Sequence, residues 1–449
     1  MKLTFYGGAK MVTGANYLLE SGGQKILIDC GLHQGNKFCE KLNFEVFPYD
    51  PKEISAVFIT HAHVDHTGLL PKLVKSGFKG KVYSTPPTKD FAELLLLDSE
   101  HILMEDAEHL GVPPLYGVRE IEELMARWEG VEYHAPINLE KFKITFYNAG
   151  HILGSSSIKI ESEGKKIIFS GDLGNSPTPI IGSREEIPDG IDYCLIESTY
   201  GDRVHEDRPK RKELLENIIE DAVRAGGVLM IPAFAMERTQ ELLFELNELT
   251  ENGRIPKIPV FLDSPLAIKL TEVYKKYENY FNSEARELIK TGDAIFNFPG
   301  LKKTLTTDES KTINDVPPPK IIIAGSGMST AGRILHHEKR YLPDPKSTLL
   351  IVGYQGYGSL GRKILDGEKT VRIHKEEVAV NCRIVSIGGY SAHADQPQLI
   401  EWLKPMRHSL KKVFIVQGEE SAMKVFSQKL KDELAIDAEI PDLSITKEI

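Results

Sequence analysis

Hydrophobic and polar residues alternate along several short runs in the first part of the chain, a pattern typical of half-buried β-strands. Polar turns that contain glycine, at residues 21–24 and 162–165, separate neighbouring runs and are typical of β-hairpins. Helical stretches lie between the runs, for example at 88–108 and 119–129. The expected strands lie within residues 3–8, 16–31, 54–60, 80–85, 141–151, 156–174 and 193–198. The pattern predicts sheets that are covered by helices.

The periodicity changes after about residue 206, where strands and helices begin to alternate. An amphipathic helix is expected at 208–227, because Gly226 and Gly227 provide its C-terminal stop. Strand–helix pairs follow at 228–253, 258–277 and 319–342, with a further apolar strand within 347–355. This alternation favours a parallel α/β sheet. Alternating strands return near residue 370, so we predict an α/β domain at 207–385 that is inserted into a domain formed by 1–206 and 386–449.

Composition narrows the class of protein without naming a function. The 449 residues are 41% hydrophobic and 27% charged, as in a globular protein with a sizeable core, and no apolar run is long enough for a membrane span. The four cysteines are scattered and form no C-x-x-C pair, which favours free thiols in a reducing cytoplasm. The net charge of −10 argues against binding of polyanions by bulk charge, but it allows a local basic groove or a metal site.

One short run, THAHVDHTG at residues 60–68, concentrates side chains that bind metals. His61, His63, Asp65 and His66 are four metal-binding residue types within six positions. A single histidine at a strand end is more often a core or surface residue, and an Asp-Gly pair is more often a turn. Four such residues in six positions are rare by chance, so the run predicts a divalent metal site.

Further ligand candidates follow other predicted strands. His151, Asp172 and Asp29 each come directly after an apolar run. Because strand ends meet at the edge of a shared sheet, we expect these side chains to converge on the histidine run.

These residues and a series of motifs carry a resemblance to a known family. The histidine run with Asp29, His151 and Asp172 resembles the metallo-β-lactamase fold hydrolases. The second half narrows the resemblance to the β-CASP nucleases, which include the endonuclease subunit of cleavage and polyadenylation specificity factor and similar bacterial and archaeal ribonucleases. The motifs are IESTYGDR, IPAFAMERTQELL, FLDSPLA, IIAGSGMSTAGRILHH, VGYQGYGSLGR and GYSAHAD. The implied fold is an α/β protein: a metallo-β-lactamase αββα sandwich with an inserted parallel α/β β-CASP domain.

The resemblance implies two zinc ions held by different halves of the histidine run. One ion is expected on His61, His63, His151 and Asp172, and the second on Asp65 and His66 with Asp172 as the bridge. A hydroxide between the ions would be the nucleophile, because two metals lower the pKa of bound water and neutralise the phosphate. Asp29 would orient a histidine ligand or the nucleophile, and we count Asp29 and Asp65 among the catalytic residues.

Two further motifs complete the expected catalytic set. Glu197 and His393 match the first two β-CASP motifs and suggest a carboxylate–imidazole pair that protonates the leaving oxygen. Outside the family pattern, a turn-capping role for Glu197 and a helix-start role for His393 are equally good explanations. Gln417 departs from the pattern, because RNA-processing members usually have histidine there. A Gln417 carbonyl oxygen can bind a cation but is a poorer zinc ligand than imidazole, so the second ion is expected to be weaker, exchangeable or absent.

Substrate contacts are expected in the inserted domain, where polar residues follow apolar strands. Backbone N–H groups and arginines at such positions can hold phosphates. Ordinary packing explains any single one of them at least as well. The candidates are Arg238, Ser264, Ser326, Ser329, Arg333 and Arg362.

The predicted function is that of a cytoplasmic, zinc-dependent ribonuclease acting on single-stranded RNA. Alternatives are a DNA-directed nuclease, another metallo-hydrolase of the same fold, or a non-catalytic RNA-binding subunit. Inactive relatives usually lose several residues of the histidine run, whereas this chain keeps all four. No membrane partner is expected, and a homodimer is allowed. Endonucleolytic and exonucleolytic cleavage, and the choice of RNA, stay open.

Overall fold

The computed structural model describes residues 1–35, 37–205, 209–353, 355–356, 358–388 and 390–449. The chain divides into two compact units, of which the first combines Met1–Val204 with Ala392–Ile449 and the second comprises His205–Ser391. The sequence placed the end of the inserted domain at residue 385. In the structure this unit extends to Ser391, and β19 (Arg383–Ser386) pairs with β16 (Thr348–Ile351) as an edge strand of the inserted sheet.

The first unit contains two mixed sheets. Within the described residues, one sheet has the order β22-β1-β2-β3-β4-β5-β6. Its first strands form antiparallel hairpins, whereas β3 to β6 run parallel. The strands are β1 (Lys2–Phe5), β2 (Tyr17–Ser21), β3 (Gln24–Ile28), β4 (Ile54–Phe58), β5 (Lys81–Ser84), β6 (Trp128–Gly130) and β22 (Thr446–Glu448).

The other sheet of this unit has the order β21-β20-β11-β10-β9-β8-β7 over the described residues. Its antiparallel part, β7 to β10, continues into a parallel part made of β10, β11, β20 and β21. The strands are β7 (Ile137–Leu139), β8 (Phe142–Asn148), β9 (Ser156–Ser162), β10 (Lys165–Phe169), β11 (Tyr193–Glu197), β20 (Lys412–Val416) and β21 (Ala438–Glu439).

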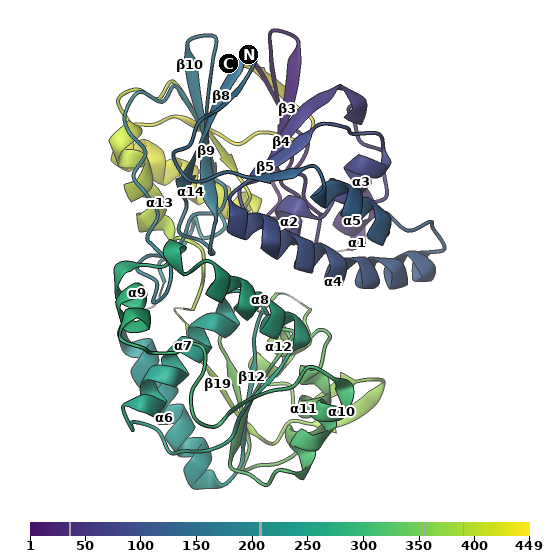
Figure 1. The fold of residues 1–449 in the computed structure, drawn as a ribbon, viewed down its shortest axis with the longest axis vertical. Coiled ribbons are helices and arrows are strands. Elements are labelled where there is room, and N and C mark those ends of the chain that lie inside the picture. Colours follow the sequence, from purple (N-terminus) through teal and green to yellow (C-terminus); the bar gives the residue numbers. More distant parts are fainter. Residues whose placement is uncertain (36, 206–208, 354, 357, 389) are drawn as a thin grey trace. The chain divides into compact units, whose positions relative to one another are not determined.

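The two sheets pack face to face and are covered by helices on their outer faces (Figure 1). Their shared core joins side chains such as Ile28 and Phe58 of one sheet to Phe146 and Phe169 of the other. Trp402 and Phe426 of the C-terminal helices pack on the outer face of the second sheet. The helices are α1 (Lys37–Leu42), α2 (Val64–Thr67), α3 (Leu70–Lys75), α4 (Pro86–Leu110), α5 (Val118–Met125), α13 (Gln396–Leu403) and α14 (Glu420–Leu434), with short 3-10 turns at Pro51–Glu53 and Lys404–Met406.

Two of these helices correspond to the helices expected at 88–108 and 119–129. Helix α4 begins earlier than expected because Pro86 and Pro87 fit the first helical positions. It ends where Gly111 adopts a left-handed conformation with φ 66°. No helix among the described residues has the length and apolarity that a membrane crossing requires.

The second unit is a parallel sheet flanked by helices, as expected for the inserted domain. Its strand order over the described residues is β14-β13-β15-β12-β16-β19, and a separate hairpin joins β17 to β18. The strands are β12 (Val228–Pro232), β13 (Val260–Asp263), β14 (Leu301–Lys303), β15 (Lys320–Ala324), β16, β17 (Thr370–Ile373), β18 (Glu376–Ala379) and β19. The helices are α6 (Pro209–Ala225), α7 (Arg238–Glu251), α8 (Pro265–Lys276), α9 (Ser283–Lys290), α10 (Thr307–Thr312), α11 (Ile334–Tyr341) and α12 (Leu360–Leu365), with 3-10 turns at Glu278–Tyr280 and Ile313–Asp315.

Candidate metal centre

The histidine run lies between the end of strand β4 and the short helix α2. His61 precedes the helix and His63 is its N-cap residue, so both side chains leave the chain before the first turn. Asp65 and His66 belong to the turn itself. The loop after β3 packs so closely here that a Cβ atom on Gly31 would lie 1.6 Å from the Asp65 carbonyl oxygen. Glycine at this position therefore lets the two segments meet.

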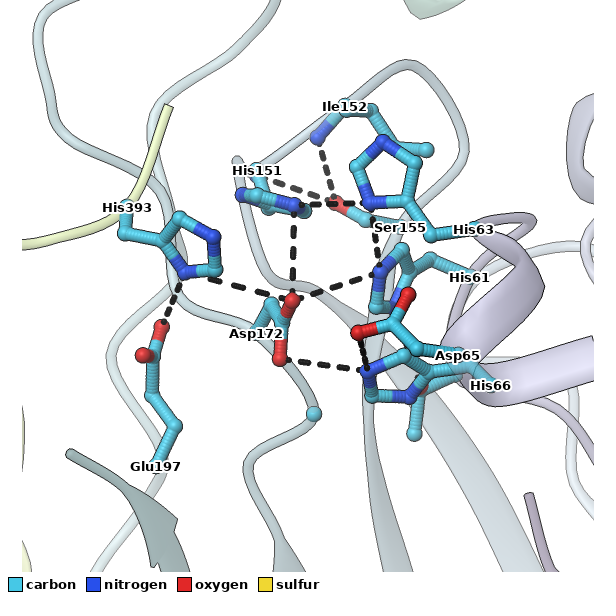
Figure 2. A network of polar contacts seen from close by, with 12 residues as sticks. His61, His63, Asp65, His66, His151, Ile152, Ser155, Asp172, Glu197 and His393 are labelled. Atoms are coloured by element: carbon cyan, nitrogen blue, oxygen red, sulfur yellow. Dashed lines mark hydrogen bonds and ion pairs between the residues drawn. The ribbon is translucent and has the colours of Figure 1, made fainter. Parts of the chain in front are cut away.

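Two loops of the other sheet bring His151 and Asp172 to the same place. His151 follows β8 and Asp172 follows β10. These loops also touch, because a Cβ atom on Gly174 would lie 1.7 Å from the carbonyl oxygen of Gly150. Figure 2 shows Asp172 at the centre, with its carboxylate directed at the histidines. The convergence expected for these strand ends is thus present.

The donor atoms have the spacing of a tetrahedral metal site. His63 Nδ1 lies 3.0 Å from His61 Nε2 and 3.3 Å from His151 Nε2. Asp172 Oδ2 lies 3.4 Å from His61 Nε2 and 3.6 Å from His151 Nε2. Bonds of about 2.0–2.1 Å in a tetrahedral shell place neighbouring donors about 3.3 Å apart. The four side chains therefore fit a single divalent ion.

The electrostatics of these groups suit metal binding. Burial lowers the pKa of the His63 ring to about 4. Burial likewise lowers the pKa of His61 and of His151, so all three rings are neutral and offer lone pairs. Burial alone would raise the pKa of Asp172, but His66 and His61 lower it well below its usual range. The site thus presents neutral imidazoles around a carboxylate.

Asp29 contacts the Nδ1 side of the His66 ring, opposite the nitrogen that faces Asp172. Its Oδ2 atom lies 2.8 Å from His66 Nδ1, and its two oxygens accept hydrogen bonds from the N–H and the hydroxyl of Thr60, each at 2.8 Å. Nδ1 of His66 thus faces Asp29, and Nε2 faces Asp172. Burial alone would lower the pKa of His66, but Asp172 and Asp29 raise it well above its usual range. The sequence did not single out Thr60, although it directly precedes His61.

The second half of the cluster contains Asp65, His66 and Gln417. His66 Nε2 lies 3.4 Å from Asp172 Oδ1 and 3.9 Å from Asp65 Oδ2. Gln417 follows β20 and lies beside His66 and Asp172, as the family pattern implied. Its amide nitrogen, and not the carbonyl oxygen, faces these two groups at 2.9 and 2.8 Å. In this orientation the amide donates a hydrogen bond to Asp172.

Glu197 and His393 form the expected carboxylate–imidazole pair next to Asp172. His393 Nδ1 lies 3.3 Å from Glu197 Oε1 and 3.9 Å from Asp172 Oδ2. Glu197 also accepts a hydrogen bond of 2.7 Å from the Leu173 N–H. Burial alone would lower the pKa of His393, but Glu197 and Asp172 raise it to about 9. The backbone around His393 pairs with Gly174, so the pair is held against the Asp172 loop.

The candidate substrate residues gather after strands of the parallel sheet in the second unit. Arg238 and Ser329 are buried, and each is bonded to a buried carboxylate, Glu241 for the arginine and Glu338 for the serine. Arg333 donates hydrogen bonds to Asp263 and to two backbone carbonyls. These contacts favour a packing role for all three.

Of the other three candidates, Ser264 is buried, whereas Ser326 and Arg362 are partly exposed. Ser264 caps helix α8, where its hydroxyl accepts a hydrogen bond of 3.3 Å from the Ala267 N–H. Ser326 is half-buried and accepts from the N–H groups of the following turn. The guanidinium of Arg362 pairs with Asp366 one helical turn later and is 43% exposed. Ser326 and Arg362 are thus the candidates that best keep atoms available to a substrate.

Comparison with known sequence families identifies three domains in chain order. Residues 12–221 match the Metallo-beta-lactamase superfamily, and residues 239–364 match the Beta-Casp domain. Residues 377–441 match the Zn-dependent metallo-hydrolase RNA specificity domain. The fold predicted from the sequence is therefore confirmed.

Curated relatives extend over nearly the whole chain. Ribonuclease TTHA0252 of Thermus thermophilus is 39% identical over 94% of each chain. The RNase J-like protein of Methanocaldococcus jannaschii is 32% identical and covers 98% of this chain and 97% of its own. Cleavage and polyadenylation specificity factor 73 of Drosophila melanogaster is 31% identical over 96% of this chain and 62% of its own.

The fold also matches a solved structure, a protein of unknown function from Enterococcus faecalis V583. Its TM-score is 0.58 at 12% identity, over 99% of both chains. That likeness concerns the fold alone. The full-length similarity to the curated relatives, with the ordered domains and the clustered ligands, shows that the chain belongs to the β-CASP family of metallo-β-lactamase-fold hydrolases.

Proposed function

We propose that this chain is a zinc-dependent ribonuclease that hydrolyses phosphodiester bonds of single-stranded RNA in the cytoplasm. The main support is the set of four donors from His61, His63, His151 and Asp172, whose spacing fits a tetrahedral ion. The Glu197–His393 pair lies directly beside this set. Three neutral imidazoles and one carboxylate suit zinc. The relatives named as ribonucleases support RNA as the substrate. Four cysteines that form no disulfide agree with a reducing compartment.

A bound divalent ion supplies Lewis-acid chemistry, because it lowers the pKa of bound water and neutralises charge on a phosphate. The chain's own residues hold and orient the reacting groups. Asp29 fixes the ring of His66, and Asp65 adds a carboxylate at the open side of the cluster, where its side chain is 19% exposed. We assign Asp29 an orienting role and Asp65 a catalytic one.

His393 is the candidate general acid. Glu197 holds Nδ1 of the ring, so the opposite nitrogen, Nε2, is directed away from Glu197. A hydrogen on that nitrogen can be donated to the oxygen that leaves when the phosphodiester bond breaks. The backbone bond of 2.7 Å from the Ala394 N–H to the Leu173 carbonyl fixes the ring beside the Asp172 loop.

A panel of substrates tests the reaction class. The purified chain, supplied with zinc or manganese, is incubated with single-stranded RNA, single-stranded DNA and small esters. We expect cleavage of RNA and little cleavage of the others. Cleavage of DNA alone would favour a DNA-directed nuclease, and cleavage of an ester alone would overturn the nuclease assignment.

A ligand variant separates an enzyme from a non-catalytic RNA-binding subunit. Replacing His63→Ala removes one donor of the tetrahedral set, so cleavage should be lost while RNA still binds in a gel-shift assay. The matched control is His134→Ala, because His134 is exposed and pairs with Glu185 outside the cluster. Unchanged cleavage by the His63 variant would contradict the proposed site.

A further inference from the structure

Gln417 is held in the cluster by its backbone and not only by its side chain. The residue is 3% exposed and has a left-handed backbone with φ 50°. Its N–H donates a hydrogen bond of 2.7 Å to the Gly8 carbonyl, and its carbonyl accepts from the Ser198 N–H at 3.2 Å. A third contact, from the Thr199 hydroxyl at 3.2 Å, holds the same carbonyl. The amide therefore emerges from a fixed point beside the cluster.

The amide nitrogen of Gln417 occupies the place between two atoms that a second ion would need. Nε2 donates a hydrogen bond of 2.8 Å to Asp172 Oδ1 and lies 2.9 Å from His66 Nε2. These two atoms are themselves only 3.4 Å apart, so one group placed between them contacts both. An ion placed between the same two atoms would have to displace the amide.

Two neighbours fix the direction of the amide. Reversing it would set Oε1 against the ionised Asp172 carboxylate, which places two acceptors in contact. The Tyr17 hydroxyl, also buried, lies 3.4 Å from Oε1 and donates toward it. Each contact directs NH2 toward the cluster and Oε1 away from it.

Histidine at this position would act differently. A neutral imidazole presents a lone pair without a hydrogen on one nitrogen, and is therefore a ligand. An amide NH2 has no lone pair to offer, because its nitrogen is a donor only. In this orientation Gln417 thus offers the cluster a hydrogen-bond donor where histidine would offer a metal ligand.

We infer that the Gln417 amide takes the place of the second metal ion, so that the chain works with a single ion on His61, His63, His151 and Asp172. The inference rests on the proposed metal-dependent function and changes its expected ion count from two to one. Asp65 is then a carboxylate of the site without being a metal ligand. Tyr17 becomes a positioning residue, since it acts on the site only through the amide.

Metal stoichiometry tests this inference without a measurement of cleavage. Wild type and Gln417→His are dialysed to equilibrium against buffered zinc, and bound zinc is counted by elemental analysis. We expect about one ion per chain in the wild type and about two in the variant, because imidazole restores a ligand. Gln428→His, on the exposed face of α14, is the matched control and should stay at about one ion.

Substitution of Asp65 gives a second and more specific test of the ion count. In the wild type Asp65→Ala should leave the zinc count unchanged, whereas in Gln417→His the same substitution should return it from about two to about one. Tyr17→Phe should raise the apparent affinity for a second ion, because the amide can then turn its oxygen inward. Manganese-loaded samples give an independent readout: isolated Mn²⁺ resonances in wild type and a spin-coupled pair in Gln417→His.

The outcomes separate failure of the inference from failure of the proposed function. Two tightly bound ions in the wild type, or loss of an ion on Asp65→Ala alone, would overturn the inference even if RNA is cleaved. A wild-type count of one, with two in Gln417→His, supports the inference even if the substrate panel shows no RNA cleavage.

Discussion

At the scale of single residues, Asp172 divides the cluster into two unlike halves. Its Oδ2 lies 3.4 and 3.6 Å from the Nε2 atoms of His61 and His151, close to the separation expected between two ligands of one metal ion. Its Oδ1 accepts from the Gln417 amide at 2.8 Å, which is hydrogen-bond spacing. One carboxylate therefore faces a candidate metal site on one side and a hydrogen-bonded polar network on the other, as Figure 2 shows for the histidines of the candidate site.

His393 offers a residue-scale prediction about catalysis. His393→Gln removes an ionisable ring but keeps a polar side chain of similar reach, so kcat should fall by about 10²–10⁴-fold, the usual worth of general acid catalysis. Zinc content should not change, because His393 is not in the tetrahedral set. Single-turnover kinetics with elemental analysis measure both. Loss of zinc together with activity would show that His393 acts through the metal site.

Glu338 carries a prediction about stability and pH. Burial raises the pKa of this carboxyl to about 7, despite a hydrogen bond from Ser329. Its Oε2 atom has no hydrogen-bond partner among the residues that the structure describes. A folded-state pKa above the unfolded value of about 4.3 means that stability is fully present at low pH and is lost as pH rises to about 7.

Glu338→Gln should therefore stabilise the second unit at about pH 8 by roughly 3 kcal/mol and have little effect near pH 4. Urea unfolding at the two pH values measures the difference. The control is Glu376→Gln, an exposed carboxylate paired with Lys339. Equal pH profiles for wild type and the Glu338 variant would refute the assignment of the pKa to this residue.

At the scale of elements, the functional groups lie where strands end. The histidine run follows β4, Asp172 follows β10, Glu197 ends β11 and Gln417 follows β20. Strands β10, β11 and β20 are parallel neighbours, so their carboxyl ends lie at one edge. Short loops from this edge reach the site without long flexible segments, which favours fixed geometry.

Ser264 distinguishes an element-scale role from a substrate-binding role. As the N-cap of α8 it contributes about 1 kcal/mol to stability, so Ser264→Ala should lower the unfolding free energy of the second unit by that amount. If the cap is its only role, KM for RNA should not change. Asn282→Ala is the matched control, because Asn282 caps α9 in the same way. A raised KM for the Ser264 variant alone would establish a substrate contact.

At the scale of the whole molecule, each unit has its own hydrophobic core, and the candidate metal ligands all belong to the first unit. Binding of a ligand to the folded state stabilises that state, by about 2.7 kcal/mol at 100 times Kd. A chelator should therefore lower the calorimetric Tm of one transition and leave the other unchanged. A uniform shift of both transitions would contradict independent cores.

Much of this architecture could be predicted from local sequence. Alternation at 54–60 and 156–174 corresponds to β4, β9 and β10, and the helix expected at 208–227 corresponds to α6. The end of the inserted unit is poorly marked in the sequence, because β19 shows no alternation of buried and exposed residues. Only its pairing with β16 assigns it to the parallel sheet. The local sequence of a strand does not indicate which distant strand it pairs with.

The sequence by itself determined which groups can bind metal, because the dense run from His61 to His66 and its order with His151 and Asp172 are properties of the chain. The tertiary structure decided how those groups are used. Whether Gln417 presents an oxygen or an NH2 group depends on Asp172, His66 and Tyr17, which lie far from it in sequence. Donor and acceptor pairing is settled by contact across the two sheets. Residue identity alone predicted a ligand at Gln417, and the structure directs the nitrogen of its amide toward Asp172 and His66.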